Sequence, residues 1–394
     1  MTAFDIIGRL ADDDHVLRDT AGVARKHSYR VRLDNGAVRE SIDLLVGRVP
    51  DVMVTSYYLA VDIASRSLLI SQSYFDIVRW FPDMHPIIDG ARFRLIANAR
   101  VIEAPHVLIG GPVDGVWYHW MVSWCARILI FKQLKPDLFA DPTIRFLIDA
   151  KASQPPYRDM ILALGVDEAR VTYVRGDEDL LLKDAILVSF PDQRFLYPDL
   201  VRDFASTIKA HFLSGVEILR ARRSLVPTWI SNRLSSTNTG RRRIFTSRQA
   251  IEHPKRRIHN FEEIEPILTA FGFEIVNLAE VSAQDQVKMF AEAEFVLGVH
   301  GSDLTDLMFC DAGTGVLVIE NQRNVTMGIA ASLDILCQIV GAKYHRMVVG
   351  EHIVAGTDYS AFPDEHNRDV IIPPDDLRNK LLAIGCKPLD RIRG

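Results

Sequence analysis

The sequence predicts an α/β fold made of two halves, each with a parallel sheet that carries helices on its faces. From about residue 91, short apolar segments alternate with helical segments, which is typical of such a sheet. A connector that contains Pro227 and a Ser/Thr/Asn/Gly run at 235–240 interrupts this alternation over residues 221–243, and the alternation then begins again. Two halves of this kind place a ligand crevice at the carboxyl ends of their strands.

Length, composition and charge bound the class of protein. A chain of 394 residues suits two or three domains, and 48% hydrophobic with 25% charged residues is usual for globular proteins. A net charge of −5 argues against a nucleic-acid partner. The sequence has no basic start followed by an apolar run and no stretch of about 20 apolar residues, so we expect no signal peptide or spanning helix, and a cytoplasmic location.

Residues 1–90 are expected to form a β-rich N-terminal elaboration. The run Asp34-Asn35-Gly36 is a turn signal between two short strands at 29–32 and 38–41. Trp80 and Phe81 are candidates for peripheral contact with a membrane surface, although a place in the core is the favoured interpretation.

The first α/β half is expected over residues 91–225. Trp117, Trp120 and Trp124 mark the start of an apolar helix, and Gly165 supplies the stop of a later one. The expected helices span 118–134, 157–164 and 199–220, and the expected strands span 92–96, 106–109, 144–148, 171–174 and 185–188.

The second half is expected over residues 226–374, followed by a C-terminal helix within 375–394 that can pack back on the first half. Acidic residues at 262 and 263 suit the first turn of a helix, and Ser282 with Asp285 resembles a helix cap. The expected helices span 261–270, 283–293, 303–310 and 375–385, and the expected strands span 244–247, 273–276, 295–299 and 315–319.

A strand, a tight turn and a helix follow one another around His300, Gly301 and Ser302. The unpaired N–H groups at a helix start can hold a phosphate, and Gly301 lets a ligand approach the backbone. His300, Ser302 and Thr305 add hydrogen-bonding side chains. An ordinary capped turn is the plain alternative, because this context is necessary for a phosphate site but not sufficient.

Two further residues follow strands of the same half. Glu320 ends the strand 315–319, where a carboxylate is placed to accept hydrogen bonds from ribose hydroxyls. Arg248 follows the strand 244–247, and its guanidinium suits a diphosphate. Solvated loop residues are the alternative for both, and five other arginines are left open: Arg241, Arg242, Arg243, Arg256 and Arg257.

Three residues of the first half compete as a general base. His119 opens the apolar helix and has an ordinary pKa near working pH, although a buried structural histidine is the alternative. Asp114 and Asp149 are its rivals, the latter directly after a strand. The four cysteines are widely separated without a CxxC pair, which indicates buried thiols rather than a zinc site or disulfides.

Taken together, these segments resemble the glycosyltransferase family 61 proteins from about residue 91 to 325. The resemblance rests on the order and spacing of several blocks: Tyr118-His119-Trp120, Ala163-Leu164-Gly165, Ile244–Arg248, Arg257–Asn260 with Glu262 and Glu263, Gly272-Phe273, Ser282–Gln286, Phe290–Ala293, Val299–Thr305 and Val318–Glu320. The family commonly has Asn at the position of Asp306 and a small residue at that of Asp303.

The resemblance implies a GT-B fold, which consists of two facing Rossmann-like domains, with the acceptor in the first and a nucleotide sugar, usually a UDP-sugar, in the second. It implies inversion at the anomeric carbon and places His300, Gly301, Arg248 and Glu320 in the donor site. Because this chain has no anchor, it fits a bacterial enzyme that acts on capsular or lipopolysaccharide precursors, with a glycan or lipid-linked glycan as acceptor. The sequence leaves its oligomeric state open.

We expect no cofactor and no metal, because arginine, helix-end N–H groups and His300 can neutralise a leaving diphosphate. The only acidic run, Asp12-Asp13-Asp14, lies in the leader and follows no strand. Two other classes remain: a degenerate, nucleotide-binding scaffold of a polysaccharide-assembly complex, and another diphosphate-using enzyme of the same fold. A dehydrogenase is disfavoured because no GxGxxG follows a strand.

Overall fold

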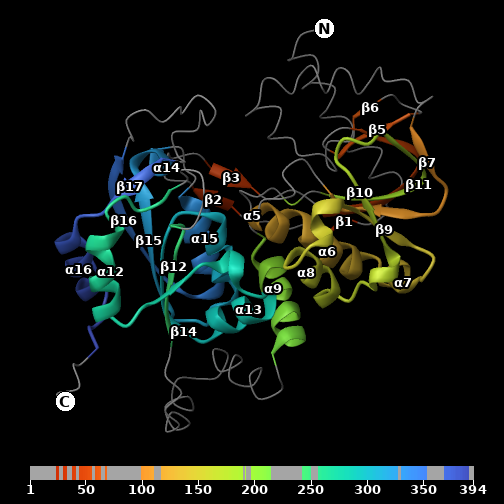
Figure 1. Ribbon diagram of the computed structural model, residues 1–394. Coiled ribbons are helices and arrows are strands. Elements are labelled where there is room, and N and C mark those ends of the chain that lie inside the picture. The colour runs from red at the N-terminus through yellow and green to blue at the C-terminus, as the bar shows by residue number, and fades with distance from the viewer. Residues whose placement is uncertain are drawn as a thin grey trace. The chain divides into compact units, whose positions relative to one another are not determined.

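The structure is a computed structural model of the chain. It describes residues 24–25, 30–32, 38–40, 44–55, 58–63, 67–68, 99–110, 117–189, 191, 197–213, 242–249, 256–326, 330–352 and 368–389. The chain divides into two compact units, one formed by Met1–Val31 with Arg39–Leu200 and the other by Arg32–Val38 with Val201–Gly394. Each unit contains its own sheet, so each is described by itself (Figure 1).

The second unit is built on a six-stranded sheet in the order β13-β12-β14-β15-β16-β17. All neighbouring strands are parallel except the last pair, in which β17 runs antiparallel to β16. The strands are β12 (Arg242–Thr246), β13 (Glu274–Val276), β14 (Ala293–Val299), β15 (Gly315–Asn321), β16 (Lys343–His352) and β17 (Asp369–Ile371). The first five follow the order 2-1-3-4-5, which is a common order of doubly wound folds.

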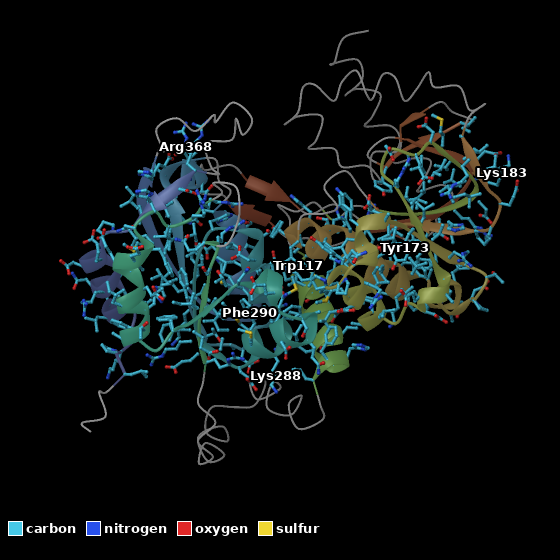
Figure 2. All side chains as sticks on the ribbon, viewed as in Figure 1. Trp117, Tyr173, Lys183, Lys288, Phe290 and Arg368 are labelled. Carbon is cyan, nitrogen blue, oxygen red and sulfur yellow. The ribbon has the colours of Figure 1, made fainter. Side chains whose placement is uncertain are left out.

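Helices cover both faces of this sheet, as Figure 1 shows. On one face lie α12 (Phe261–Ala270) and α16 (Pro374–Ala383), and on the other α13 (Ala283–Ala291) and α15 (Ala331–Val340). On α13, Phe290 is fully buried while Lys288 is only half-buried (Figure 2), as expected of an amphipathic surface helix. The short helices of this unit are the 3₁₀ segments Leu278–Glu280 and Ser302–Phe309, and α14 (Gln322–Thr326).

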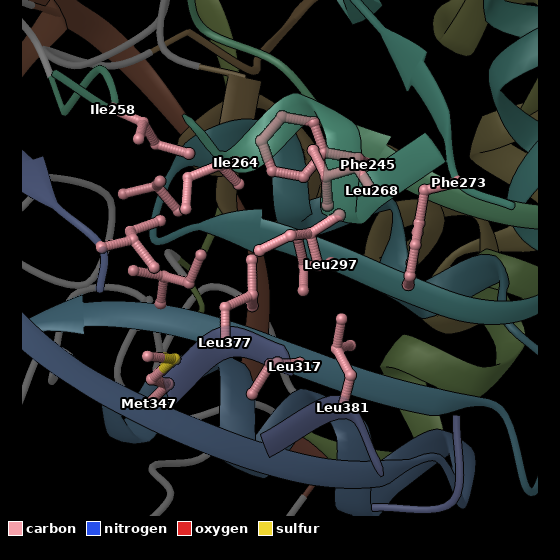
Figure 3. Close-up of a cluster of buried hydrophobic side chains, with 14 of the residues drawn as sticks. Phe245, Ile258, Ile264, Leu268, Phe273, Leu297, Leu317, Met347, Leu377 and Leu381 are labelled. Carbon is pink, nitrogen blue, oxygen red and sulfur yellow. The ribbon is translucent and has the colours of Figure 1, made fainter. Parts of the chain in front are cut away.

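The core under α12 and α16 is a single apolar cluster, shown in Figure 3. Phe245 and Leu297 come from the sheet, Leu268 from α12, and Leu377 and Leu381 from α16. The expected helix 375–385 is present as α16 and is part of the second unit's own core. The reason is its apolar spacing of four residues, which turns one stripe of the helix toward this sheet.

Local signals placed several elements of this unit correctly. The predicted helix 261–270 is α12 itself, and Gly272 after it takes a positive φ of 73°, the conformation that ends many helices. Ser282 caps α13 by accepting a hydrogen bond from the backbone N–H of Asp285. The predicted helix 303–310 is present as a 3₁₀ helix rather than an α-helix.

The first unit contains a mixed sheet in the order β10-β9-β8-β11-β4-β5-β6. The pairs from β10 to β11 are parallel, and β11, β4, β5 and β6 follow antiparallel. The bounds are β4 (Leu44–Thr55), β5 (Leu59–Asp62), β6 (Ser67–Leu68), β8 (His106–Leu108), β9 (Arg145–Asp149), β10 (Val171–Val174) and β11 (Leu180–Val188). Two short strands pair beside this path: β1 (Ala24–Arg25) with β4, and β7 (Arg100–Ile102) with β11. Strands from before and after residue 90 thus share one sheet.

One helical stretch from Trp117 to Leu134 lies against this sheet, as the apolar pattern predicted. It consists of α5 (Trp117–His119), a π-helical segment (Trp120–Cys125) and α6 (Ala126–Leu134). The unit's other helices are α7 (Pro136–Ala140), α8 (Tyr157–Ala163) and the 3₁₀ segments Ala150–Ser153 and Glu168–Arg170. Gly165 ends α8 with a φ of 90°. The helix α9 (Pro198–Phe212) contains the point in the sequence where the first unit ends and the second continues. It ends earlier than the expected helix 199–220.

Other expectations concern the N-terminal region, the cysteines and the membrane. The strands β2 (Arg30–Arg32) and β3 (Val38–Glu40) pair as expected, while the turn 34–36, the strand 92–96, Asp12–Asp14 and Trp80 with Phe81 lie outside the described residues. All four cysteines are buried free thiols. Within the described part of the chain, every helix is too short or too polar to cross a bilayer.

Candidate functional site

The topological switch point of the second unit lies between β12 and β14. From β12 the chain crosses to β13 on one side, and from β13 it returns to β14 on the other side. The loops that follow β12 and β14 therefore diverge and leave a crevice at their carboxyl ends, where ligands of doubly wound folds bind. Arg248 follows β12, and His300 and Gly301 follow β14. The structure brings these three sequence-predicted residues together at this point.

Arg248 forms an ion pair with Asp303 directly over Gly301. The Arg248 Nη1 atom lies 2.9 Å from Asp303 Oδ1, and both side chains are mostly buried, with 12% and 18% of their surface exposed. A Cβ atom added at Gly301 would collide with both partners of this pair. A side chain at position 301 would therefore force Arg248 and Asp303 to shift, whereas the φ of −172° would suit any residue.

Asp303 thus has a partner, which the sequence did not reveal. The Oδ2 atom of Asp303 and the Nε atom of Arg248 are also buried, and within the described residues neither has a hydrogen-bond partner. Buried polar groups of this kind usually find partners in a protein or in its ligand. The pair therefore retains hydrogen-bonding capacity that its own members do not use.

His300 is held by the next strand of the sheet. Its Nδ1 atom lies 2.8 Å from Glu320 Oε1, and its backbone N–H donates to the carbonyl of Ile319. The second carboxylate oxygen of Glu320 accepts a hydrogen bond of 2.9 Å from the side-chain amide of Asn324. Because Glu320 fixes the imidazole through Nδ1, the ring nitrogen left for a ligand is Nε2, and an imidazolium donates from both nitrogens.

Glu320 differs from its expected role at a ribose. It is fully buried, and each carboxylate oxygen is already bonded to a protein side chain. A ribose hydroxyl would have to displace one of these partners and leave it buried and unsatisfied, which is costly. The geometry instead makes Glu320 a residue that orients His300.

Ser302 and Thr305 begin the 3₁₀ helix that follows the turn. The Thr305 hydroxyl is fully buried and donates to the carbonyl of Ser302 over 2.6 Å, so it closes the helix start rather than facing a ligand. Ser302 is half-buried at the first helical position, where backbone N–H groups lack intrahelical partners. Of these two hydroxyl groups, only that of Ser302 is placed to meet an anion at the turn.

Arg256 is the residue that sequence reasoning left open and the structure brings to this site. Burial, with a contribution from the nearby charge of Arg248, lowers its pKa to about 10, while Asp303 and Glu320 oppose that shift. Its Nε atom is buried and has no partner within the described residues, and its φ of 62° is unusual for a residue with a side chain. Arg256 is therefore a second cation, close enough to Arg248 and Asp303 for their charges to act on it.

The segment that carries Arg256 is fixed from two sides. The Gln249 side chain bonds both backbone groups of Ile258, at 2.7 Å and 3.0 Å. Arg257 pairs with Asp369 of β17, and Ile258 bridges Val370 of the same strand. Two of the other arginines are engaged elsewhere, since Arg242 pairs with Glu274 and Arg243 donates to the carbonyls of Phe271 and Lys387, while Arg241 lies outside the described residues. Arg256 is distinguished from these arginines by contacts that form only in the folded chain.

In the first unit, His119 lies where the helix changes to the π-helical segment. Such segments often occur at functional sites. Burial lowers the pKa of His119 to about 4, so the imidazole is neutral at pH 7 but is a weaker base than an ordinary histidine. Beside it, the half-buried Trp117 and Tyr157 rings meet edge to face with centroids 5.5 Å apart, and Trp117 is labelled in Figure 2.

Asp149 is occupied by hydrogen bonds from its own unit. Its Oδ2 atom accepts from the Tyr58 hydroxyl over 2.5 Å, and its Oδ1 atom accepts from the backbone N–H of Lys151 over 2.7 Å. It is buried and caps the 3₁₀ segment Ala150–Ser153. These contacts fit a structural carboxylate better than a general base. Asp114, the third candidate base, lies outside the described residues.

The described residues contain no cluster of three His, Cys, Asp or Glu side chains with the spacing of a metal site. The candidate site of the second unit is instead a set of two arginines, one histidine and two acidic partners around a glycine turn. This set offers cationic donors at the carboxyl ends of β12 and β14, an arrangement suited to a phosphate-bearing ligand.

A comparison with protein families matches the part of the chain that contains His119 and the turn at Gly301, and it ends just before Glu320. The family model described as Glycosyltransferase 61 covers residues 117–317, which is 201 of the 394 residues. The match runs from Trp117 in the first unit to β15 in the second and includes Arg248, His300 and Gly301. No curated protein matches the chain.

Proposed function

The chain belongs to glycosyltransferase family 61, and from this premise we propose that it is an inverting transferase of GT-B arrangement. It moves a sugar from a nucleotide sugar, of the UDP class usual in that family, to a glycan or lipid-linked glycan acceptor. The proposed setting is the synthesis of bacterial surface polysaccharide at the cytoplasmic side of the membrane. The single observation that carries the proposal is the Arg248–Asp303 pair packed over Gly301, next to the oriented imidazole of His300.

The donor's diphosphate is proposed to bind at this turn. Arg248 and Arg256 supply positive charge, Nε2 of His300 supplies a hydrogen bond, and the backbone N–H groups at Ser302 complete the contacts. These donors are fixed before the ligand arrives, because Glu320 orients His300 and Gln249 anchors the loop of Arg256. Preorganised donors of this kind stabilise the charge that develops on a leaving diphosphate.

The reaction is proposed to be one displacement at the anomeric carbon. A base removes the proton of an acceptor hydroxyl as its oxygen attacks the carbon from the face opposite the nucleotide, and the bond from that carbon to the diphosphate oxygen breaks. His119 is the proposed base because it stands at the start of the π-helical segment, and Asp114 and Asp149 are the alternatives. The diphosphate leaves with the bonding electron pair, and Arg248, Arg256 and His300 neutralise its charge without a metal ion.

The test is binding and turnover of nucleotide sugars by the full chain. Thermal unfolding is measured with UDP, GDP, CMP and their common sugar conjugates, without metal, on the wild type and on His300→Ala. A ligand at about 100 times its Kd stabilises by roughly 2.7 kcal/mol, which is measurable. We expect a shift with one nucleotide class that is lost in the variant, with Glu351→Gln, a surface carboxylate, as control.

Turnover separates the enzyme from the degenerate scaffold. Hydrolysis or transfer of the bound sugar in the presence of EDTA supports the metal-independent transferase. Binding without turnover, even with added manganese or magnesium, favours the scaffold, and turnover restored only by those ions contradicts metal independence. Stabilisation by none of the nucleotides would remove the basis of the proposed donor site.

A further inference from the structure

Asp303 stands out at the candidate site because it places a carboxylate where an anionic ligand would bind. Its Oδ1 atom is 2.9 Å from Arg248 Nη1, over the backbone of Gly301. The proposed diphosphate requires the same guanidinium and the same turn. A carboxylate and a phosphate oxygen are alike to an arginine, since each accepts N–H hydrogen bonds and carries negative charge.

We propose that Asp303 is an internal substitute for the donor's diphosphate, which holds Arg248 in the unliganded protein and gives it up when the donor binds. This inference rests on the proposed function, because it assumes that the turn binds a diphosphate. It makes Asp303 a residue that sets donor affinity without contacting the donor. Binding then exchanges one charge-assisted hydrogen bond for another, so part of the ligand's interaction energy is spent on breaking the internal pair.

The geometry favours exchange over a fixed pair. The contact is a single hydrogen bond from one Nη atom, whereas the strongest arginine–carboxylate pairs use two parallel bonds. The second carboxylate oxygen of Asp303 and the Nε atom of Arg248 are both buried without a partner in the described structure. A diphosphate has enough oxygens to satisfy several arginine N–H groups at once, which one carboxylate oxygen does not.

Arg256 is a second cation whose charge and that of Asp303 act on each other, and its Nε atom is buried with no partner among the described residues. In the proposed exchange, this charge compensates the Asp303 carboxylate after it leaves Arg248, because an isolated buried charge would be costly.

The experiment measures the affinity of UDP and of inorganic pyrophosphate by calorimetry on the full chain. The variants are Asp303→Asn, Arg248→Met and the double variant. Asp303→Asn is expected to tighten UDP binding by about tenfold, because the ligand no longer competes with a charged partner. The matched control is Glu274→Gln, which removes the carboxylate partner of Arg242. This pair joins the start of β12 to the start of β13, away from the carboxyl ends of the strands, so the substitution is expected to change Kd less than twofold.

The double variant tells exchange from plain repulsion. If Asp303 acts by occupying Arg248, the gain from Asp303→Asn disappears in the Arg248→Met background. A gain that persists there means that Asp303 repels the ligand directly, and overturns the proposal. Weaker UDP binding in Asp303→Asn, with an unchanged unfolding temperature, means that Asp303 positions Arg248 and also overturns it.

Failure of the proposed function has a different signature. If neither the wild type nor any variant binds UDP, other nucleotides or pyrophosphate, the donor site itself is absent and the exchange falls with it. If the wild type binds UDP and Asp303→Asn binds it equally well, the donor site stands and only the exchange is rejected. Asp303→Ser repeats the measurement with a small residue, in case asparagine keeps a hydrogen bond to Arg248.

Discussion

The imidazole of His300 lies 2.8 Å from the carboxylate of Glu320, although twenty positions separate them in the chain. The two residues stand at the ends of adjacent parallel strands, and Val299 and Ile319 are register partners just before them. The sheet therefore fixes the histidine through a fully buried carboxylate. His300 and Glu320 are brought together by the pairing of β14 with β15 and not by closeness in the sequence.

Replacement of Glu320 by Gln is expected to weaken both the fold and the site. Glutamine has one acceptor oxygen where the carboxylate serves both His300 and Asn324, so one buried donor loses its partner. We expect a loss of about 1–3 kcal/mol in the free energy of unfolding, measured with urea, and weaker nucleotide binding. The control Glu351→Gln breaks a half-exposed pair with Arg368 and should cost below about 1 kcal/mol. Equal losses in the two variants would contradict the orienting role.

Replacement of Gly301 by Ala is expected to separate Arg248 from Asp303. The added methyl group would overlap both partners, so the side chains must move or the turn must open. Overpacking of this kind typically costs about 1–3 kcal/mol, and nucleotide affinity should fall with it. Gly350→Ala is the matched control, since a Cβ there meets no atom within 4 Å. A Gly301→Ala protein with wild-type stability and affinity would show that the close approach is not needed.

Acid is expected to destabilise the wild type through His119. Its pKa is lowered from 6.5 to about 4 in the folded protein, so below pH 6.5 the unfolded chain takes up a proton that the folded protein resists. The free energy of unfolding should therefore fall as pH drops from about 6.5 to 4, and the contribution is absent above pH 7. In His119→Gln this part of the acid loss should vanish. Parallel stability curves for both proteins between pH 7 and 4 would refute the shift.

Asp149→Asn tests whether that residue is a base or a structural cap. Asparagine keeps an oxygen for the Lys151 N–H and an amide for the Tyr58 hydroxyl, so we expect at least a tenth of the transfer activity to remain. Loss of a general base typically costs a factor of about 10²–10⁴. Tyr58→Phe provides the comparison, because it should lower stability by about 1 kcal/mol and leave activity largely intact. A hundredfold loss in Asp149→Asn alone would assign the base to Asp149.

Short sequence signals were enough to predict several helices and strands of the second unit. Gly272 and Ser282 lie within a few residues of the groups that they satisfy, so their effect on α12 and α13 is visible in the sequence. The residues at the ends of β12 and β14 could also be found, because a parallel sheet places the carboxyl ends of its strands at one edge.

Features that depend on distant partners could not be found in the same way. The strand β4 runs unbroken through Pro50 and Asp51, which are residue types that favour turns, and Asp51 pairs with Lys183 on the neighbouring strand β11. Arg256 is one of six nearby arginines, and only its anchoring by Gln249 and β17 selects it. The burial of Glu320 likewise follows from β14 and β16 on either side of it.

The bridge between Ile258 and Val370 has a consequence for how the protein is made. Arg257 and Ile258 depend on contacts with Asp369 and Val370, about 112 positions later in the chain. During synthesis, which proceeds from the N-terminus, the sheet from β12 to β16 can assemble before β17 emerges. The segment of Arg256 gains its contacts with β17 only after residue 370 has been synthesised, so the proposed donor site is completed later than the sheet that supports it.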